Sequence, residues 1–354
     1  MPDAPSARPP WHPDSLADRL PFLRRRARLI AETRAFFAAR GYAEVETPCL
    51  VPVPGMEVHL RAFRSGWRPH LGAGGAARPL WLRTSPELAL KRLLVAGAGP
   101  AFELARVWRN GEALGPLHAP EFTMLEWYRP GLSFVGLMDE TEAFLRAVCP
   151  PRVAHAGVET DLRLPFERLS VAHAFAAHCG GLDILGTEGD GPRLRAEARR
   201  VGLAAGDDEG WEDLFFRLLL ERVEPRIGRA RATFLTHWPA PQAALARRDP
   251  ADPRAAMRFE LFAAGVELAN AFDELTDPAE QRERFAHDAA ERRRLHGPDD
   301  PDGGWDVDED FLRALEHGMP AGSGIALGFD RLAMLASGAR RIEDVLWLPF
   351  ASNG

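Results

Sequence analysis

Two glutamates seven positions apart are the first candidates for chemistry in this sequence. In the stretch FELFAAGVEL, a two-residue turn at Ala263 and Ala264 would place Glu260 directly opposite Glu267 across an antiparallel pair of strands. Like charges that face each other there, at a Cβ separation of roughly 5 Å, are destabilising. A Mg²⁺ ion between them would remove the repulsion, since carboxylates and phosphate oxygens are its usual ligands. Two solvated carboxylates on an outer face fit the same spacing.

The same segment continues into a polar and aromatic face. Strand alternation of period two places Asn270, Phe272 and Glu274 on one side, which suits a pocket for an ammonium group. Glu267 is one step out of phase with them. A shared pocket therefore requires a β-bulge between Glu267 and Asn270, or side chains that reach round the edge. A half-buried strand with Phe272 in the core explains the same pattern.

A third candidate set lies in FELARVWRNGEALGPLHAPEFTMLEWY, where two strand-like segments flank a polar loop. Arg109 ends the first segment, and its planar guanidinium can bind a carboxylate and a phosphate together. Alternation in the second segment places Phe122, Met124, Glu126 and Tyr128 on one face, where Phe122 could stack on a purine. Polar groups on such a face need partners, although a plain hairpin with surface charges is also compatible.

The last candidate is GSGIALGFDRLAML, a glycine-rich strand that runs into a helix. Its small residues would let a ligand approach the backbone, and Arg331 falls in the first turn of the helix. Glycine-rich strand-to-helix turns also occur as purely structural features.

The elements that must position these residues indicate an α+β fold. Apolar residues at helical spacing predict a helix over residues 18–40, which Gly41 is placed to end. A strand broken by Pro48 follows, residues 65–79 have the composition of a surface loop, and Ser85 is placed to cap another helix. Strands joined by hairpins with helices outside predict a mainly antiparallel β-sheet flanked by helices.

Length and composition favour a single large catalytic domain. Residues 1–17 are Pro-rich and polar, which predicts a flexible tail before a domain over 18–354 with a helical insertion near 135–235. The net charge of −7 disfavours a protein that grips long nucleic acid. Three isolated cysteines, no signal-peptide core and no apolar run of membrane length predict a cytoplasmic protein.

Taken in order, these segments resemble the three signature motifs of class II aminoacyl-tRNA synthetases. GYAEVETPCL resembles the first motif, VWRNGE through EFTMLEWY the second, and GIALGFDRLAML the third. SPELALKRL, PEFTMLEWY and VELANAFDELTD are similar to lysyl-tRNA synthetases in particular. The resemblance runs from about Arg19 to Pro349. It implies the catalytic core of that class, ATP as substrate, Mg²⁺, and a homodimer formed through the region around Pro48.

The resemblance also assigns roles to the candidate residues. Arg109 and Arg331 would be catalytic, with Arg109 bridging the amino-acid carboxylate and the α-phosphate while Phe122 and Arg331 enclose the adenine. Glu260 and Glu267 would hold Mg²⁺. The remaining ATP-binding positions would be Asn110, Glu112, His118, Leu268 and Gly328. The amino-acid site would comprise Ser85 and Glu87 near one amino group, Glu126, Tyr128, Asn270, Phe272 and Glu274 around the distal ammonium, and Ala326 on the floor.

Two departures from the synthetases narrow the resemblance. Fewer than 20 residues precede the first predicted helix, too few for the anticodon-binding barrel of lysyl-tRNA synthetases. Ala326 stands where those enzymes have glycine, and its methyl group would crowd the usual substrate. Both features are similar to the elongation factor P (R)-β-lysine ligase family, synthetase paralogues that attach β-lysine to a lysine of elongation factor P. In (R)-β-lysine the amino group moves one carbon from the carboxylate while the distal ammonium stays.

This chain also departs from that family around the second motif. The family reads RNEE where Arg109 to Glu112 spell RNGE, and one extra residue precedes His118, so Glu112 becomes the candidate for the glutamate that contacts adenine. Ala119 and Ala271 replace the asparagine and the glycine that are usual in the family. These changes would weaken or tune ATP binding.

The implied reaction is ATP-dependent activation of (R)-β-lysine or lysine as an adenylate, then transfer to the ε-amine of a lysine on elongation factor P. Binding of tRNA is not expected. The open alternatives are a truncated lysyl-tRNA synthetase-like enzyme that acts on tRNA or a small-molecule acceptor, and a non-catalytic paralogue. The last alternative predicts loss of Arg109, Arg331 or the paired glutamates, and all four residues are present.

Overall fold

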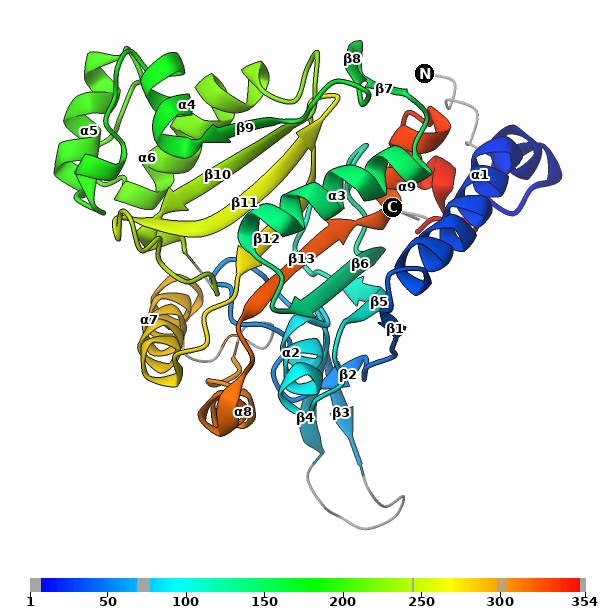
Figure 1. The fold of residues 1–354 in the computed structure, drawn as a ribbon, viewed down its shortest axis with the longest axis horizontal. Helices are drawn as coiled ribbons and strands as arrows, with labels where there is room; N and C mark the ends of the chain where they lie inside the picture. Colours follow the sequence, from blue (N-terminus) through cyan, green and yellow to red (C-terminus); the bar gives the residue numbers. More distant parts are fainter. Residues whose placement is uncertain (1–7, 69–76, 244, 298–299, 301–303, 351–354) are drawn as a thin grey trace, which may run out of the picture.

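An eight-stranded sheet forms the centre of the molecule (Figure 1). The computed structural model describes residues 8–68, 77–243, 245–297, 300 and 304–350. In spatial order the strands are β1 (Ala43–Glu44), β5 (Ala101–Trp108), β6 (Glu121–Pro130), β13 (Gly322–Gly328), β12 (Val266–Asp273), β11 (Ala255–Ala263), β10 (Thr233–Pro239) and β9 (Glu167–Ser170). The parallel pairs in this sheet are β1 with β5 and β9 with β10. The other neighbours run antiparallel, so the predicted α+β architecture is confirmed.

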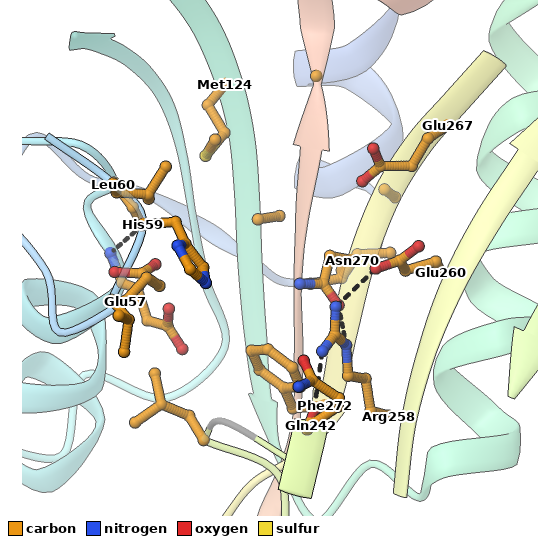
Figure 2. Close-up of a pocket in the computed structure, with 18 of the residues that line it drawn as sticks. Glu57, His59, Leu60, Met124, Gln242, Arg258, Glu260, Glu267, Asn270 and Phe272 are labelled. Carbon is orange, nitrogen blue, oxygen red and sulfur yellow. Dashed lines mark hydrogen bonds and ion pairs between the residues drawn. The ribbon is translucent and has the colours of Figure 1, made fainter. Parts of the chain in front are cut away.

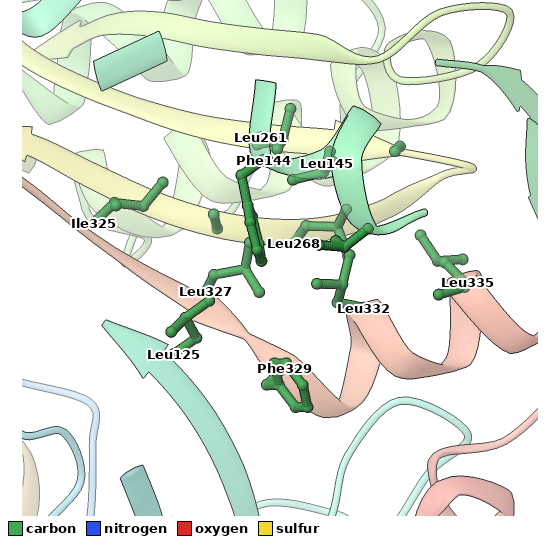
Figure 3. Packing of buried hydrophobic residues seen from close by; sticks show 14 of the residues in the cluster. Leu125, Phe144, Leu145, Leu261, Leu268, Ile325, Leu327, Phe329, Leu332 and Leu335 are labelled. Carbon is green, nitrogen blue, oxygen red and sulfur yellow. The ribbon is translucent and has the colours of Figure 1, made fainter. Parts of the chain in front are cut away.

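One face of the sheet is covered by α1 (Pro13–Ala38), α3 (Phe134–Val148) and α9 (Phe329–Ser337). Side chains from these helices and from the central strands form the main hydrophobic core, and Figure 3 shows Phe144 and Leu332 among the sheet residues. Helix α1 begins at Pro13, before the predicted start, because Pro13 occupies the first helical turn and His12 caps it. Gly41 follows its end with a φ of 76°, as expected for a residue that stops a helix.

Helices α2 (Glu87–Val95), α7 (Pro278–His296) and α8 (Glu309–Gly318) pack around a separate core. That core contains Phe272 of β12, whereas the neighbouring Ala271 belongs to the main core. Successive residues of a strand point to opposite faces, so these helices lie on the sheet face that α1, α3 and α9 leave uncovered.

The segment near 135–235 is only partly helical, which corrects the predicted helical insertion. Helices α4 (Val171–His178), α5 (Gly191–Arg200) and α6 (Trp211–Leu218) enclose a third core. The hairpin of β7 (Arg152–His155) with β8 (Val158–Asp161) precedes them, and β9 extends the main sheet. Short helical turns are η1 (Leu185–Thr187), η2 (Leu219–Val223), η3 (Glu224–Arg226), η4 (Ala240–Gln242) and η5 (Ile342–Val345).

A small sheet adjoins the main one in the order β2 (Leu50–Val51), β4 (Arg78–Leu82), β3 (Arg64–Trp67). The surface loop predicted for 65–79 is therefore wrong at both ends, where β3 and β4 pair, and its residues 69–76 lie outside the described part of the chain. In the portion that the structure describes, no helix has both the length and the apolar character needed to cross a membrane.

Candidate active site

A cavity of about 700 Å³ opens on the sheet face that carries Phe272. This volume suits a nucleotide together with a small amino acid. Figure 2 shows Glu57, His59 and Leu60 on one wall and Asn270, Phe272 and Arg258 on the other. Most of the predicted site residues line it, namely Ser85, Glu87, Arg109, Glu112, His118, Phe122, Tyr128, Glu260, Glu267, Leu268, Asn270, Phe272, Ala326, Gly328 and Arg331.

Three predicted residues are not part of the cavity wall. Asn110 lies in the β5–β6 loop, where its Oδ1 accepts a hydrogen bond of 2.9 Å from the backbone amide of Gly111. Glu126 and Glu274 are buried behind the wall. Glu126 contacts Ser85 and Tyr128, which border the cavity, whereas Glu274 is ion-paired with Lys91 behind the wall.

Arg109 follows β5, and Phe122 returns beside it in β6, as the predicted hairpin requires. The Arg109 guanidinium lies over the Phe122 ring, 5.3 Å from its centroid. Its Nη1 lies 3.6 Å from Oε1 of Glu112, and its buried Nε has no hydrogen-bond partner among the described residues. Arg109 therefore keeps donors for a carboxylate or a phosphate, the groups that its planar fork matches.

Arg331 lies in the first turn of α9, again as predicted. Its Nη1 donates to the backbone oxygen of Glu267 at 2.9 Å, and its Nη2 lies 2.9 Å from Nε2 of His118. Burial lowers the pKa of His118, and the charge of Arg331 lowers it further. A neutral imidazole can accept the hydrogen bond from Arg331, so these three expected ATP-binding residues form one connected group.

The turn between β11 and β12 lies one residue later than the sequence predicted. Ala264 and Gly265 have φ values of 53° and 71°, the conformation of a two-residue hairpin turn with positive φ at both positions. In the resulting register Glu260 faces Asn270. The predicted direct pairing of Glu260 with Glu267 is therefore wrong.

A β-bulge in β12 restores the proximity of the expected site residues. The register shifts so that Leu268 has no partner in β11, which is the defining feature of a bulge. The bulge that the sequence required between Glu267 and Asn270 is therefore present. Both side chains line the same cavity as a result.

Glu260 is held by an arginine from its own strand. Nη2 of Arg258 donates to Oε1 of Glu260 at 2.6 Å, and Nε of Arg258 donates to Oδ1 of Asn270 at 3.1 Å (Figure 2). Burial raises the pKa of Glu260 to about 8, Arg258 opposes the shift, and the nearby charge of Glu267 adds to it.

This donor set fits a magnesium ion that arrives with phosphate. Burial and the charge of Glu267 raise the proton affinity of Glu260, so a hard cation beside the two carboxylates would be favourable, and Mg²⁺ usually takes one or two carboxylates together with substrate phosphates. Across the described ranges, no three His, Cys, Asp or Glu side chains gather closely enough to hold a metal. Glu260 and Glu267 would therefore need phosphate and water oxygens to complete the coordination.

Glu126 is anchored at the end of the cavity where the amino acid is expected to bind. Its Oε1 accepts a hydrogen bond of 2.6 Å from Ser85 Oγ, and its Oε2 accepts one of 2.9 Å from the hydroxyl of Tyr128. Burial raises the pKa of Glu126 to about 8, and the charge of Glu87 contributes to the shift. An ammonium group near this carboxyl would favour its ionised form, since opposite charges stabilise each other most where water is excluded.

Lys91 lies between two of the predicted amino-acid-site carboxylates. Its Nζ is 2.6 Å from Oε1 of Glu87 and 2.6 Å from Oε2 of Glu274, and the lysine is 1% exposed. Burial favours loss of its proton, but the charges of Glu274 and Glu87 outweigh burial and raise the pKa of Lys91. Glu274, expected to face the distal ammonium of a substrate, is thus already paired with a cation of the chain itself.

Sequence comparisons agree with this geometry. The family model described as tRNA synthetases class II (D, K and N) matches residues 18–352. The chain belongs to this family. An elongation factor P (R)-β-lysine ligase from Haemophilus influenzae (strain PittGG) is 43% identical over 326 residues, which cover 92% of this chain and 93% of that protein.

The family match and the ligase relative together show that this chain is an ATP-dependent amino-acid ligase with the class II synthetase fold. The resemblance drawn from the sequence motifs is confirmed. The roles of individual residues stay predictions. The geometry around Ala326 is relevant to its predicted place on the floor of the amino-acid site.

In this synthetase-family enzyme, Ala326 lies on β13 between two site residues. Its neighbours across the strands are Asn270 on β12 and Glu126 on β6. Two positions earlier, a Cβ on Gly324 would lie 2.1 Å from the Tyr128 ring, so no larger residue fits there. The floor of the cavity is therefore tight at Gly324, and Ala326 adds one methyl group to its lining.

Sequence reasoning missed three side chains that shape the site, Lys91, Arg258 and Glu57, and the glycine at position 324. Lys91 stands four residues after Glu87, a spacing at which opposite charges pair on a helix, and that signal was available. Arg258 stands two residues before Glu260, and strand alternation predicts that both lie on the same face. Glu57 lies in an irregular segment and carried no such signal.

Proposed function

We propose that this enzyme activates (R)-β-lysine with ATP and transfers it to the ε-amine of a lysine on elongation factor P. The observation that carries the proposal is the acidic end of the cavity, where Glu87 and Tyr128 line the wall and Glu126 lies behind it, hydrogen-bonded to Tyr128. Such a lining favours an amino acid with more than one ammonium group, because buried carboxylates are stabilised by cations. The name of the ligase relative supports the choice of β-lysine and of the acceptor protein.

In the first step, a carboxylate oxygen of the amino acid attacks the α-phosphorus of ATP. The bond from that phosphorus to the oxygen bridging the β-phosphate breaks, which yields the aminoacyl-adenylate and pyrophosphate. Arg109 would hold the carboxylate beside the phosphate, while Phe122 and Arg331 would fix the adenine. Mg²⁺ bound at Glu260 and Glu267 would neutralise phosphate charge.

In the second step, the unprotonated ε-amine of the acceptor lysine attacks the activated carbonyl carbon. The new amide bond forms, the amine proton is released, and AMP leaves with the electrons of the broken anhydride bond. No nucleophile from the chain takes part. The residues of this enzyme would act by holding the adenylate and by excluding water from it.

The test of the first step is amino-acid-dependent exchange between ATP and pyrophosphate, with (R)-β-lysine compared to L-α-lysine. Exchange should be faster with β-lysine, and Arg109→Ala should lower it by roughly 100-fold or more. Arg106→Ala is the matched control, because Arg106 lies three residues earlier, on β5, and is exposed. Preference for α-lysine would favour a lysyl-tRNA synthetase-like enzyme, and no exchange with either would refute the lysine assignment.

The test of the second step uses purified elongation factor P as acceptor. Incubation with ATP, (R)-β-lysine and the enzyme should release AMP and raise the mass of elongation factor P by one lysyl group. Substitution of its acceptor lysine by arginine should abolish the shift. Transfer to tRNA in place of the protein would contradict the proposal.

The oligomeric state and the location stay predictions. The expected homodimer through the region around Pro48 can be tested by sedimentation of the purified enzyme, and the expected cytoplasmic location by cell fractionation.

A further inference from the structure

Glu57 presents a carboxylate oxygen to the amino-acid end of the cavity without a partner. It lies in the segment between β2 and β3 and lines the main cavity. Its Oε2 is buried and accepts no hydrogen bond from the part of the chain that the structure describes. Gly55 permits this position, because a Cβ there would lie 2.5 Å from Oε2 of Glu57 and 2.8 Å from Oγ1 of Thr84.

The other carboxylates at this end of the cavity already have ion-pair or hydrogen-bond partners within the chain. Glu87 and Glu274 share the ammonium of Lys91 at 2.6 Å each. Glu126 accepts hydrogen bonds from Ser85 and Tyr128. Glu57 is half-buried, but its Oε2 is enclosed without a hydrogen-bond partner among the described residues and, unlike Glu274, Glu57 has no ion pair with Lys91. An enclosed carboxylate oxygen without a partner is costly, so a cation supplied by a ligand would stabilise Glu57.

A small side cavity lies beside Glu57. It measures about 10 Å³ and is bordered by Glu57, Ser85 and Glu87 among others. This space holds roughly one group the size of a water molecule, and an ammonium group is of that size. Burial raises the pKa of Glu87, Lys91 opposes this shift, and the negative charge of Glu57 adds to it. The two carboxylates are therefore close enough to repel each other across the side cavity.

The position of Glu57 decides which ammonium it can reach. Figure 2 places Glu57 on the wall opposite Asn270 and Phe272. The distal ammonium of the substrate is expected at that opposite wall, close to Asn270 and Phe272, so Glu57 faces its expected position from across the cavity. Glu57 is therefore available to the second ammonium group of a diamino acid.

We propose that Glu57 binds the ammonium group nearest the substrate carboxylate, which is the 3-amino group of (R)-β-lysine, together with Ser85 and Glu87. This inference rests on the proposed function, and it makes Glu57 a specificity residue for diamino acids. The competing partner inside the chain is Arg292 of α7, which is buried. Arg292 donates to the backbone oxygen of Met56 at 2.7 Å and stacks on Trp305, and neither its Nε and Nη1 nor Oε2 of Glu57 has a hydrogen-bond partner among the described residues.

The experiment compares Glu57→Gln with the unchanged enzyme and removes one substrate amine at a time. The KM for (R)-β-lysine in pyrophosphate exchange is measured, with inhibition constants for 6-aminohexanoate, which lacks the 3-amino group, and for 3-aminohexanoate, which lacks the distal one. Glu57→Gln should raise the KM for (R)-β-lysine and the inhibition constant of 3-aminohexanoate by roughly 10- to 100-fold. The inhibition constant of 6-aminohexanoate should change less than about twofold, because it offers Glu57 no ammonium.

Glu316→Gln is the matched control, because Glu316 is an exposed carboxylate of α8 that does not line the cavity. It should leave all three constants unchanged. Equal losses for all three compounds in Glu57→Gln, or equal losses in Arg292→Met, would overturn the inference and make Glu57 a structural partner of Arg292. A loss confined to 6-aminohexanoate would assign Glu57 to the distal ammonium and also overturn it. Failure of the unchanged enzyme to exchange with either lysine isomer would instead refute the proposed function itself.

Discussion

Nζ of Lys91 lies 2.6 Å from Oε2 of Glu274, and both side chains are almost completely excluded from water. Glu87 contacts the same ammonium, so one lysine compensates two buried carboxylates. Such an arrangement is strongly destabilised when one partner is removed, because the remaining charges stay buried without compensation. We therefore expect Lys91 to be required for the stability of the structure around these two carboxylates.

Lys91→Met should lower the free energy of unfolding by about 3 to 5 kcal/mol at neutral pH, measured by urea denaturation. The deficit should shrink as the pH falls toward the ordinary glutamate range, since protonation then neutralises Glu87 and Glu274. Arg282→Met is the control, because Arg282 forms an exposed pair with Glu309 at 2.8 Å. Its loss should cost no more than about 1 kcal/mol. Equal effects of the two substitutions would contradict the role of Lys91.

The pKa of Glu126, which burial raises to about 8, predicts a pH dependence of amino-acid binding. Below that pH the empty site holds Glu126 protonated, and a bound ammonium favours the ionised form. The dissociation constant should therefore fall as pH rises from about 6.5 to about 8, by up to roughly tenfold per unit, with release of a proton. Calorimetry in two buffers of different ionisation enthalpy measures that proton. Glu126→Gln should bind more weakly and flatten the profile, and an unaltered slope in this variant would rule Glu126 out.

Glu267→Gln should raise the Mg²⁺ concentration needed for half-maximal pyrophosphate exchange by at least about tenfold. The expected reason is the loss of one of the two carboxylates in a site that phosphate must complete. Magnesium titration of chelator-treated enzyme at saturating ATP measures the change. Glu343→Gln, at an exposed pair with Arg341, should leave the requirement unchanged. An unchanged requirement in Glu267→Gln would remove Glu267 from the metal site.

Ala326→Gly should shift the preference from (R)-β-lysine toward L-α-lysine by roughly tenfold, measured as the ratio of kcat/KM in exchange. Removal of the methyl group gives the floor of the pocket the glycine that lysyl-tRNA synthetases have. Ala271→Gly is the matched control, because Ala271 lies on the next strand but belongs to the main core. A ratio that Ala326→Gly does not move would exclude this position from substrate choice.

The hairpin strands and the final strand-to-helix unit could be predicted because their signals are local. Period-two alternation in residues 122–128 placed Phe122 and Tyr128 on one face, and both line the cavity. The position of the β11–β12 turn could not be placed from alternation alone. The turn requires positive φ at two successive residues, and Gly265 tolerates that conformation better than Ala263 would. The glycine at position 265 is the local signal that favours a turn at Ala264 and Gly265.

The connections between distant segments were harder to foresee. Lys91 and Glu274 are far apart in sequence, and only the packing of α2 against the sheet brings them together. Asp330 is a similar case, since it accepts a hydrogen bond of 2.9 Å from the backbone amide of Thr123 and pairs with Arg26 of α1. These interactions join helix α1 to β6, which carries Phe122, and to α9, which carries Arg331. No local sequence pattern predicts them.

Lys91 is also the only lysine in the sequence, and its burial has a consequence for self-damage. Acyl-adenylates that escape from an enzyme acylate accessible unprotonated amines without selectivity. The other basic side chains here are arginines and histidines, which do not form stable amides with such reagents, and the one lysine is enclosed and ion-paired. An enzyme of this composition would expose no lysine side chain to an acyl-adenylate that escapes from its site. Unwanted acylation would therefore modify mainly other proteins.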